Sequence, residues 1–479
     1  MGNVNIRGAH LSRSTRTEKD SLGTKAVPAS AYYGIQTQRA VENFPVSGIV
    51  AHRALISAYA SIKKACALAN RDLGRLDRAT ARAIISAADE VIEGRFDAHF
   101  VVDVYQAGAG TSFNMNTNEV IANRAGELLG HRRGAYDKVH PNDHVNMAQS
   151  TNDTFPTATH VAILQQLRIL RPILAALAKA FSSKGREFRS VIKSARTHLQ
   201  DAVPITLGQE FSAYGAALTA AGQELERRSA LLESVALGGT AAGTGTNAGP
   251  AFRRIAIRRL GRITDLSLRP ARDPRMGLQS HQPLAATSGA LRDLALELIR
   301  IANDLRLMAS GPTTGFAEIL LPAVQPGSSI MPGKVNPSML ECLNMVAFQI
   351  VGRDLAVALC AQAGQMDLNV MTPLAAYNLL DSTQLLANFL PEIEKRCIRG
   401  ITADAEICKE YFEKSPSLAA LLNPLIGYAR AAEIFKEALA RKRTVPELIL
   451  EKGILSREKM DRLFDPKNVA GELDRRVKD

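Results

Sequence analysis

The sequence predicts an all-α protein, and two observations support this. Of its 479 residues, 46% are apolar, yet only 5% are aromatic and tryptophan is absent. Alanine and leucine, both strong helix formers, are plentiful. Apolar residues also recur in alternating steps of three and four, the period of one buried helix face. Because β-sandwiches and barrels favour β-branched and aromatic residues, this composition argues against them.

The apolar stripes predict five long helices, taken in chain order. They run through residues 55–73, 164–181, 291–308, 343–363 and 379–390. Gly74 should end the first of these, and Ser310-Gly311-Pro312 the third, because glycine and proline terminate helices. A chain of this length exceeds one ordinary core, so we expect either two or three domains or one long bundle.

The formal net charge of +12 leaves the kind of partner open. The densest basic run, residues 253–262, has helical spacing, which is typical of a solvated helix face. No aromatic-rich strand or zinc-ligand spacing accompanies it, so no nucleic-acid partner is predicted. A positive potential would equally attract a small dianionic substrate.

Cysteine usage and the N-terminus indicate a cytoplasmic protein. The five cysteines are scattered, with no CxxC pair, and are interpreted as reduced, buried thiols. Residues 1–20 are polar and are expected to form a flexible tail rather than a secretory signal. No apolar run approaches the roughly 20 residues that span a bilayer, so no membrane contact is predicted.

Four polar segments interrupt the predicted helices. They are residues 106–119, 142–157, 196–210 and 327–336. Long polar loops on a rigid helical scaffold are where binding and catalytic groups usually lie.

The segment 327–336 combines two serines, Lys334 and Asn336 between glycines. Its backbone N–H groups could form an anion nest, to which Lys334 would add charge. It is not a P-loop, because Val335 stands where a hydroxyl residue is required. From composition alone, a structural turn explains the segment equally well.

Ser150, Thr151 and Asn152 offer neutral donors suited to a carboxylate. The same stretch could begin a helix, capped by Asn152 or Thr154. Both interpretations are compatible, because a helix N-terminus favours bound anions.

His198 lies three residues before Asp201, a spacing seen in general acid–base pairs, although a structural histidine is the simpler explanation in isolation. Residues 108–116 are small and polar, and fit a flexible loop or a carboxylate cradle equally well. The nine histidines suggest no metal site, and residues 243–247 are interpreted as a tight turn. No cofactor is predicted, with activation by a divalent metal left open.

Taken together and in this order, the segments resemble the aspartase/fumarase superfamily. Residues 327–336 fit its GSSxMPxKxN pattern at every defined position. The resemblance extends from about Ala26 to the C-terminal region. It is greater to aspartate ammonia-lyases than to class II fumarases, which tend to carry Trp-Gly at Tyr33-Gly34 and a second serine at Thr151.

The resemblance implies three helical domains and a homotetramer whose active sites are shared between subunits. After the tail, these domains would comprise residues 21–150, residues 151–405 with the central long-helix bundle and the 327–336 loop, and residues 406–479. The implied activity is the reversible elimination of ammonia from L-aspartate to give fumarate, through an enediolate. The alternatives are class II fumarase and a lyase for another aspartate derivative, because residues 248–250, 275–283 and 415–417 depart from the aspartase pattern.

The resemblance also implies a role for each site residue. Ser328 would be the catalytic base. The β-carboxylate and its enediolate would be held by Thr111, Ser150, Thr151 and Ser329. The α-carboxylate would be held by Thr197, Lys334 and Asn336. Asn152 and the second catalytic residue, His198, would bind the amino group.

Overall fold

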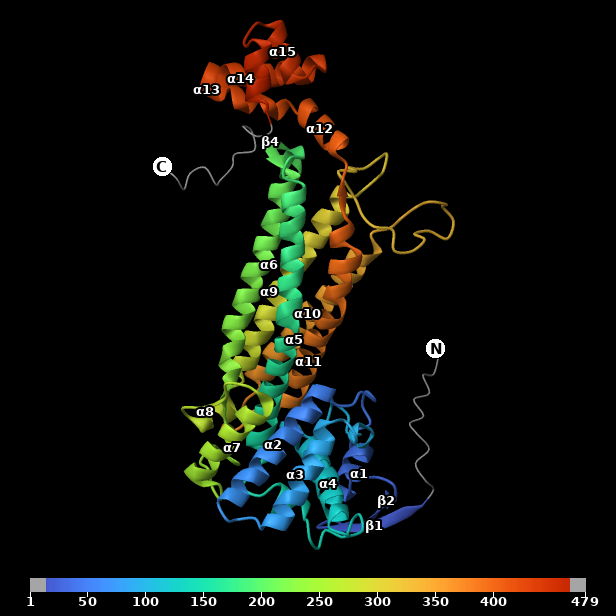
Figure 1. The fold of residues 1–479 in the computed structure, drawn as a ribbon, viewed down its shortest axis with the longest axis vertical. Helices are drawn as coiled ribbons and strands as arrows, with labels where there is room; N and C mark the ends of the chain where they lie inside the picture. The colour runs from blue at the N-terminus through green and yellow to red at the C-terminus, as the bar shows by residue number, and fades with distance from the viewer. Residues whose placement is uncertain (1–13, 466–479) are drawn as a thin grey trace. The chain divides into compact units, whose positions relative to one another are not determined.

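The computed structural model describes residues 14–465, and helices dominate it, which confirms the all-α fold class (Figure 1). The chain forms two compact units. Unit 1 combines the residues up to 170 with residues 224–293 and 349–386, and unit 2 combines residues 171–223, 294–348 and those from 387 onward. The division falls within each of five long helices, so these helices contribute residues to both units. The predicted boundaries of three domains stay predictions.

The long helices are α5 (Thr151–Glu187), α6 (Leu207–Ser229), α9 (Gln282–Met308), α10 (Ser338–Gln362) and α11 (Thr372–Arg396). Shorter helices of unit 1 are α1 (Ile35–Asn43), α2 (Arg53–Asp72), α3 (Arg78–Ile92), α4 (Thr111–Leu128), α7 (Gly249–Thr264) and α8 (Pro274–Gln279). Those of unit 2 are α12 (Ala405–Lys414), α13 (Asn423–Ile426), α14 (Tyr428–Arg441), α15 (Val445–Glu451) and α16 (Arg457–Leu463). All five predicted stripes lie within helices, apart from the terminal residues of the first and fourth.

Helix α2 is the central element of the N-terminal part of unit 1. It packs against α3, α4 and α7, and most of its residues are buried, including Tyr59 and Cys66 of the predicted stripe. It ends where expected, because Gly74 adopts a positive φ of 70° that ordinary residues disfavour. The predicted stop at residues 310–312 is confirmed too, since α9 ends at Met308.

Short β-hairpins lie between some of the helices. Strand β1 (Thr15–Asp20) pairs antiparallel with β2 (Gly23–Pro28), so the expected tail over residues 1–20 is wrong for residues 15–20. The guanidinium of Arg16 holds this hairpin by donating to the carbonyls of Pro28 and Ala31 at 2.9 and 2.7 Å. Strand β1 is almost wholly polar and β2 has only Ala26 and Val27 as apolar strand residues before Pro28, so neither shows a clear alternating pattern. Residues 1–13 lie outside the described residues.

The remaining strands form three more two-stranded sheets within residues 14–465. The pairs are β3 (Ile192–Thr197) with β4 (Gln200–Thr206), β5 (Ser234–Val235) with β6 (Arg269–Pro270), and β7 (Ile319–Leu320) with β8 (Thr402–Ala403).

In unit 2, α5 and α6 approach closely through small residues. A Cβ atom on Gly208 would lie 2.4 Å from the carbonyl oxygen of Gly185, and one on Gly215 would lie 2.9 Å from that of Ala178. Helix α6 is joined to α9 by the Tyr214 hydroxyl, which donates to Asp304 at 3.2 Å. The close packing of α5 against α6 therefore requires glycine at these positions.

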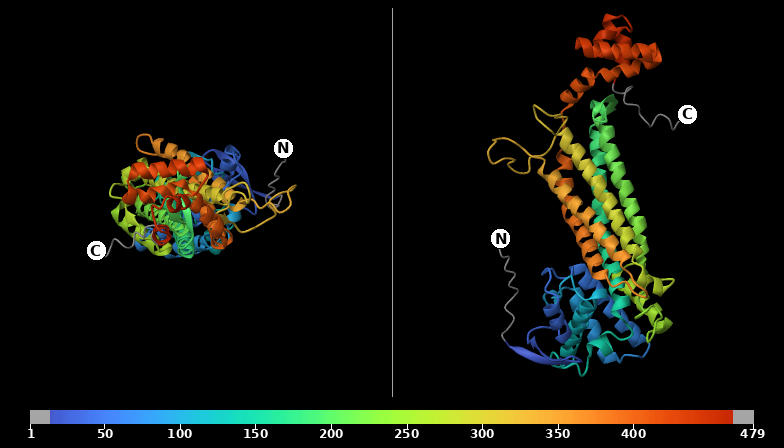
Figure 2. Two further views of the ribbon diagram at one scale, coloured as in Figure 1. Left: turned by 90° about the horizontal axis from the view of Figure 1, so that it is seen from above. Right: turned by 180° about the vertical axis from the view of Figure 1, so that it is seen from behind.

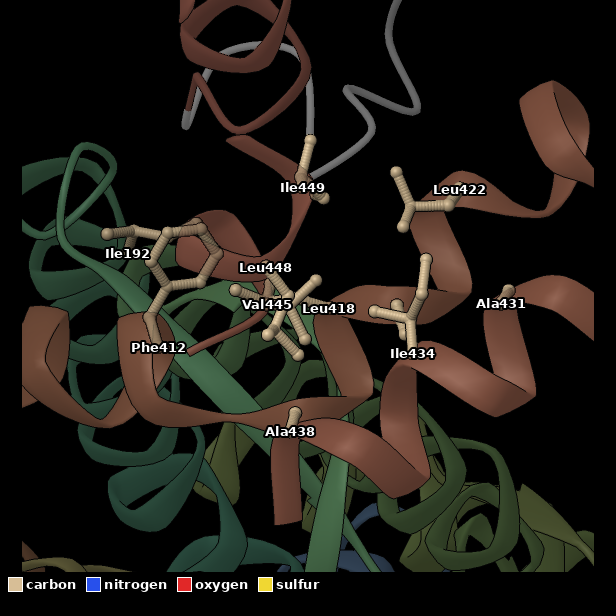
Figure 3. Packing of buried hydrophobic residues seen from close by; sticks show 11 residues of the cluster. Ile192, Phe412, Leu418, Leu422, Ala431, Ile434, Ala438, Val445, Leu448 and Ile449 are labelled. Atoms are coloured by element: carbon tan, nitrogen blue, oxygen red, sulfur yellow. The ribbon is translucent and has the colours of Figure 1, made fainter. Parts of the chain in front are cut away.

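The C-terminal part of unit 2 has a hydrophobic cluster of its own. Phe412 of α12 and Ile192 of β3 are buried against aliphatic side chains from the helices that follow (Figure 3). Those side chains include Leu418, Ile434 and Leu448. The cluster thus anchors the base of the β3–β4 hairpin to the C-terminal helices.

By length and composition alone, two of the described helices, α5 and α10, are apolar enough to cross a membrane. The expectation that no apolar stretch approaches this length is therefore wrong by that measure. Core helices of globular proteins pass the same test, and half of the most apolar window of α5 is buried within the protein.

We predict that Gly208→Ala lowers the free energy of unfolding by roughly 1–3 kcal/mol, because the new methyl group would meet only backbone atoms of residues 185 and 189. Gly289→Ala in α9 is the matched control, since its Cβ would meet only the ends of arginine side chains, the nearest at 3.3 Å. Urea unfolding of both variants at one protein concentration tests this. Equal stability of the two variants would contradict the packing argument.

Candidate active site

The predicted site residues are divided between the two units. Unit 1 contains Thr111, Ser150, Thr151 and Asn152. Unit 2 contains Thr197, His198, Ser328, Ser329, Lys334 and Asn336. Each group is described within its own unit.

Thr111 is the first residue of α4 and is exposed. The turn before it is fixed rather than flexible, because the Ala109 N–H donates to the Val370 carbonyl at 2.7 Å. Gly110 has a φ of 83°, and a Cβ there would lie 2.0 Å from the Phe155 ring. The flexible-loop interpretation of residues 108–116 is therefore wrong, and Thr111 is presented at a defined helix start.

Ser150, Thr151 and Asn152 form the start of α5. The Ser150 hydroxyl accepts the Asn152 N–H at 3.2 Å, so Ser150 caps the helix rather than Asn152 or Thr154. The Asn152 side-chain NH₂ donates to the Ala241 carbonyl at 2.8 Å, which leaves its carbonyl oxygen as an acceptor. Two helix N-termini thus present hydroxyl and amide groups in unit 1.

Asp153 organises this helix start and was missed as a functional residue. It is fully buried, and its carboxylate accepts the Ser150 N–H at 3.0 Å and the N–H groups of Gly238 and Thr240 at 2.8 and 2.9 Å. Burial raises the pKa of Asp153 to about 6, opposed by these three hydrogen bonds. The carboxylate therefore joins the start of α5 to the glycine-rich segment 236–249.

Lys63 of α2 was also missed, because it lies within an apolar stripe. Its side chain is fully buried, and its ammonium donates to the amide oxygens of Asn114, Asn146 and Gln149 at 2.8, 2.9 and 3.0 Å. Burial lowers the pKa of Lys63 to about 7. Helix α2 also contains Arg53, Lys64, Arg71 and Asp72, so one further lysine gave no signal in the sequence.

Other polar groups of α2 support the same region. The Tyr59 hydroxyl pairs with the Thr154 hydroxyl at 2.8 Å, and the Asn70 amide donates to the Met147 carbonyl at 3.1 Å. Together with Lys63, these side chains recur at steps of four and seven along α2, which places them on one helix face. The sequence pattern indicated that this face of α2 only packs in the core. The structure shows that it also supports residues 146–154.

In unit 2, Thr197 and His198 lie on the β3–β4 hairpin, not on the expected loop. His198 and Leu199 form its two-residue turn, with φ values of 56° and 60°. A two-residue hairpin turn requires a positive φ at both central residues, a conformation that residues other than glycine adopt at a cost. Among residues 14–465, no hydrogen bond joins His198 to Asp201, so the structure gives no support to an acid–base pair between them. The hairpin leaves His198 exposed at its tip.

A buried ionic cluster holds the base of this hairpin. Glu318 is fully buried and pairs with Arg196 at 2.6 Å and with Lys193 at 2.7 Å. The Arg196 guanidinium also lies 4.2 Å from the ring centre of Phe316. Because Arg196 immediately precedes Thr197, this cluster sets the position from which the turn projects.

The segment 327–336 is a closed loop within a helix-free stretch between α9 and α10 (Figure 2). Its ends meet, because the Asn336 amide donates to the Gly327 carbonyl, and a Cβ on Gly327 would lie 2.1 Å from the Lys334 carbonyl oxygen. Lys334 and Ser329 are exposed. Asn336 therefore closes the loop in addition to any contact with a ligand.

The Ser328 hydroxyl oxygen accepts the backbone N–H groups of Ile330 and Met331 at 3.3 and 2.9 Å. Hydrogen bonds donated to an oxygen stabilise its anionic form. The presence of these two backbone donors could not be inferred from the sequence.

The two groups differ in chemistry. Unit 1 presents neutral hydroxyl and amide groups at helix N-termini, which suit a carboxylate. Unit 2 presents a serine with two backbone donors, a histidine and a lysine. Among the residues that the structure describes, no group of three or more His, Cys, Asp and Glu side chains could hold a metal ion.

Two protein families match this chain. The family described as Lyase matches residues 23–352, and the family described as Fumarase C C-terminus matches residues 418–471. Together they span most of the sequence.

Individual relatives match along nearly the whole chain. An aspartate ammonia-lyase from a Bacillus species is 46% identical over 95% of this chain and 97% of its own length. A class II fumarate hydratase from Nitrosomonas europaea is 47% identical over 95% of this chain and 98% of its own length.

A solved structure agrees with these relatives. The fumarate lyase/delta crystallin of Brucella melitensis bound to cobalt superposes with a TM-score of 0.93 at 49% identity, covering 96% of this chain and all of that one. The chain therefore belongs to the aspartase/fumarase superfamily and is a lyase.

Proposed function

We propose that this protein is an aspartate ammonia-lyase, which reversibly eliminates ammonia from L-aspartate to give fumarate. The observation that carries the proposal is the Ser328 hydroxyl, whose oxygen accepts two backbone N–H groups in a closed loop with Lys334 and Asn336. An alkoxide at this position would be stabilised by both donors. It could therefore remove the weakly acidic Cβ proton of aspartate.

The difficult step is the build-up of negative charge. Loss of the Cβ proton converts the adjacent carboxylate into a doubly charged enediolate, which pre-oriented donors must stabilise. Charge-assisted hydrogen bonds contribute roughly 1.5–3 kcal/mol each, and each 1.4 kcal/mol corresponds to about a factor of ten in rate. The electron pair then forms the Cα=Cβ bond as the C–N bond breaks and ammonia leaves.

Each donor has a proposed role in this reaction. The β-carboxylate and the enediolate are held by Thr111, Ser150, Thr151 and Ser329. The α-carboxylate is held by Thr197, Lys334 and Asn336. The amino group is bound by Asn152 and His198. No cofactor is required by this chemistry, and activation by a divalent metal stays open.

The orientation of Asn152 suits the amino group of aspartate. Its NH₂ group already donates to the Ala241 carbonyl at 2.8 Å, so its oxygen is the group available to substrate. An ammonium group only donates hydrogen bonds, and a hydroxyl group can donate to the same oxygen. An acceptor at this position therefore fits aspartate well.

We further propose a cytoplasmic homotetramer with shared active sites, without membrane or nucleic-acid partners. Support comes from α10, where large apolar side chains stay exposed in the single chain. They are Met345 (63%), Phe348 (57%), Leu355 (65%) and Leu359 (59%). Exposed apolar residues along one helix are typical of a subunit interface. All described cysteines are free thiols, and only Cys342 is partly exposed, which fits a reducing compartment.

Class II fumarase is the second candidate, because a fumarate hydratase is as similar to this chain as the ammonia-lyases are. A lyase for another aspartate derivative is the third. It is suggested by residues 275–283, where the sequence departs from the aspartase pattern.

We predict that the protein consumes fumarate only when ammonium is present. The measurement follows the ultraviolet absorbance of fumarate with and without ammonium chloride, at matched ionic strength. Loss of absorbance without ammonium, with formation of malate, would establish fumarase activity instead. Release of fumarate from L-aspartate tests the reverse direction.

We predict that Ser328→Ala lowers kcat by about 10²–10⁴-fold, the usual contribution of a general base, while the variant still assembles. Thr314→Ala removes an exposed hydroxyl from the neighbouring segment and should keep full activity. Steady-state kinetics and size-exclusion chromatography of both variants test this. Wild-type turnover by a folded Ser328→Ala protein would remove Ser328 from the mechanism.

We predict that Lys334→Ala raises the KM for aspartate at least tenfold, because the exposed ammonium would pair with the α-carboxylate. Lys334→Arg keeps the charge and should restore part of the affinity. Initial-rate kinetics over a range of aspartate concentrations give both values. An unchanged KM in Lys334→Ala would exclude this role.

A further inference from the structure

Lys63 is a fully buried ammonium group without a carboxylate partner. Its three hydrogen bonds, at 2.8–3.0 Å, all go to neutral amide oxygens. Within residues 14–465, no carboxylate lies at ion-pair distance from its nitrogen. Burying an unpaired charge is expensive, and an apolar side chain of similar size would fill the same space without that penalty.

The three amides lie next to predicted substrate-binding residues. Asn114 is one helical turn after Thr111 in α4, and Gln149 directly precedes Ser150 at the start of α5. Asn146 completes the set, and its amide oxygen also accepts the Asn114 NH₂ at 3.4 Å. One ammonium group therefore joins the chain segments that present both helix N-termini.

Few other charges face Lys63. From α5, Asp153 attracts the ammonium, but its carboxylate already accepts three backbone N–H groups. From its own helix, Cys66 is a buried thiol whose pKa is raised by burial, and the Tyr59 ring centre lies 5.4 Å from the nitrogen. From α4 and residues 146–149, only neutral amides contact it. The positive charge is thus only partly compensated in the chain.

We propose that Lys63 is a positioning residue of the active site, whose ammonium fixes the starts of α4 and α5 and supplies positive potential beneath the dicarboxylate. The inference rests on the proposed function, because it assigns these helix starts to carboxylate binding. Hydroxyl and amide donors there carry no net charge. In its ammonium form, Lys63 gives them the charge that a dianion, and still more its enediolate, requires.

This role makes a specific kinetic prediction. Since the enediolate carries more negative charge than the substrate, loss of the buried cation should lower kcat as well as raise KM. A residue that served only to fill the core would instead change thermal stability and leave the kinetics of the folded protein unaltered.

The first experiment compares Lys63→Gln and Lys63→Met with the matched control Lys64→Met. Glutamine keeps an N–H donor but carries no charge. Lys64 lies next to Lys63 in the same helix and forms an ion pair with Asp89. Succinate binding by calorimetry, kcat, KM and Tm are measured for each protein. We expect at least tenfold weaker succinate binding and at least tenfold lower kcat/KM for both Lys63 variants, and wild-type values for Lys64→Met. Wild-type binding and kinetics in folded Lys63→Gln would overturn the proposal.

A second variant covers the case in which loss of Lys63 prevents folding. Asn146→Asp keeps the lysine and its contact but places a carboxylate against it, which neutralises the charge. Asn142→Asp adds the same charge to an exposed position of the same segment, as a control. We expect at least tenfold weaker succinate binding for Asn146→Asp and little change for Asn142→Asp. Equal binding by the two variants would overturn the proposal.

Succinate binding also separates this inference from the proposed function. A wild-type protein that binds no succinate and does not convert fumarate would refute the dicarboxylate site itself, and Lys63 with it. A wild-type protein that binds succinate, together with Lys63 and Asn146 variants that bind it equally well, would refute only the role of Lys63.

Discussion

Helix N-termini can bind a carboxylate only while their first turns are held in place, and two buried charges provide that restraint in unit 1. The Asp153 carboxylate binds three backbone N–H groups and links the start of α5 to residues 236–249. The Lys63 ammonium binds three amide oxygens and links α5 to α4. Hydroxyl groups rotate freely, so hydrogen bonds beneath them must define where their oxygens lie. The neutral hydroxyl and amide donors at these helix starts therefore depend on the buried charges of Asp153 and Lys63.

Unit 2 meets the same requirement by a different route. Its candidate groups lie on a hairpin turn and a closed loop, where no helix restrains them. The Glu318 cluster with Lys193 and Arg196 anchors the hairpin, and the Asn336 amide closes the loop on Gly327. The left-handed conformation of His198 is retained because the structure on both sides of the turn is fixed. The strained turn at the tip of the β3–β4 hairpin thus depends on the ion pairs that hold the rest of the hairpin.

Much of the fold could be predicted from the sequence, because apolar residues recur at steps of three and four in each long helix. The hairpins could not, since β3 and β4 lack alternating residues and a glycine turn. The site motifs were recognisable because several polar residues lie together in each. Lys63 was not, because one charge within an apolar stripe carries no pattern, and its partners come from α4 and residues 146–149. Contacts between distant segments are invisible to local periodicity.

The same scaffold can support ammonia or water chemistry, because both reactions share the carboxylates and the enediolate. Serine, threonine and lysine donors that hold these charges cannot distinguish an amino group from a hydroxyl. Discrimination must therefore come from the residues around the leaving group. In the proposed site Asn152 would contact the leaving group. Its side chain is held by a hydrogen bond to Ala241, and Ala241 belongs to the segment that Asp153 fixes through Gly238 and Thr240. Selectivity in this protein would thus depend on a backbone segment that touches no substrate.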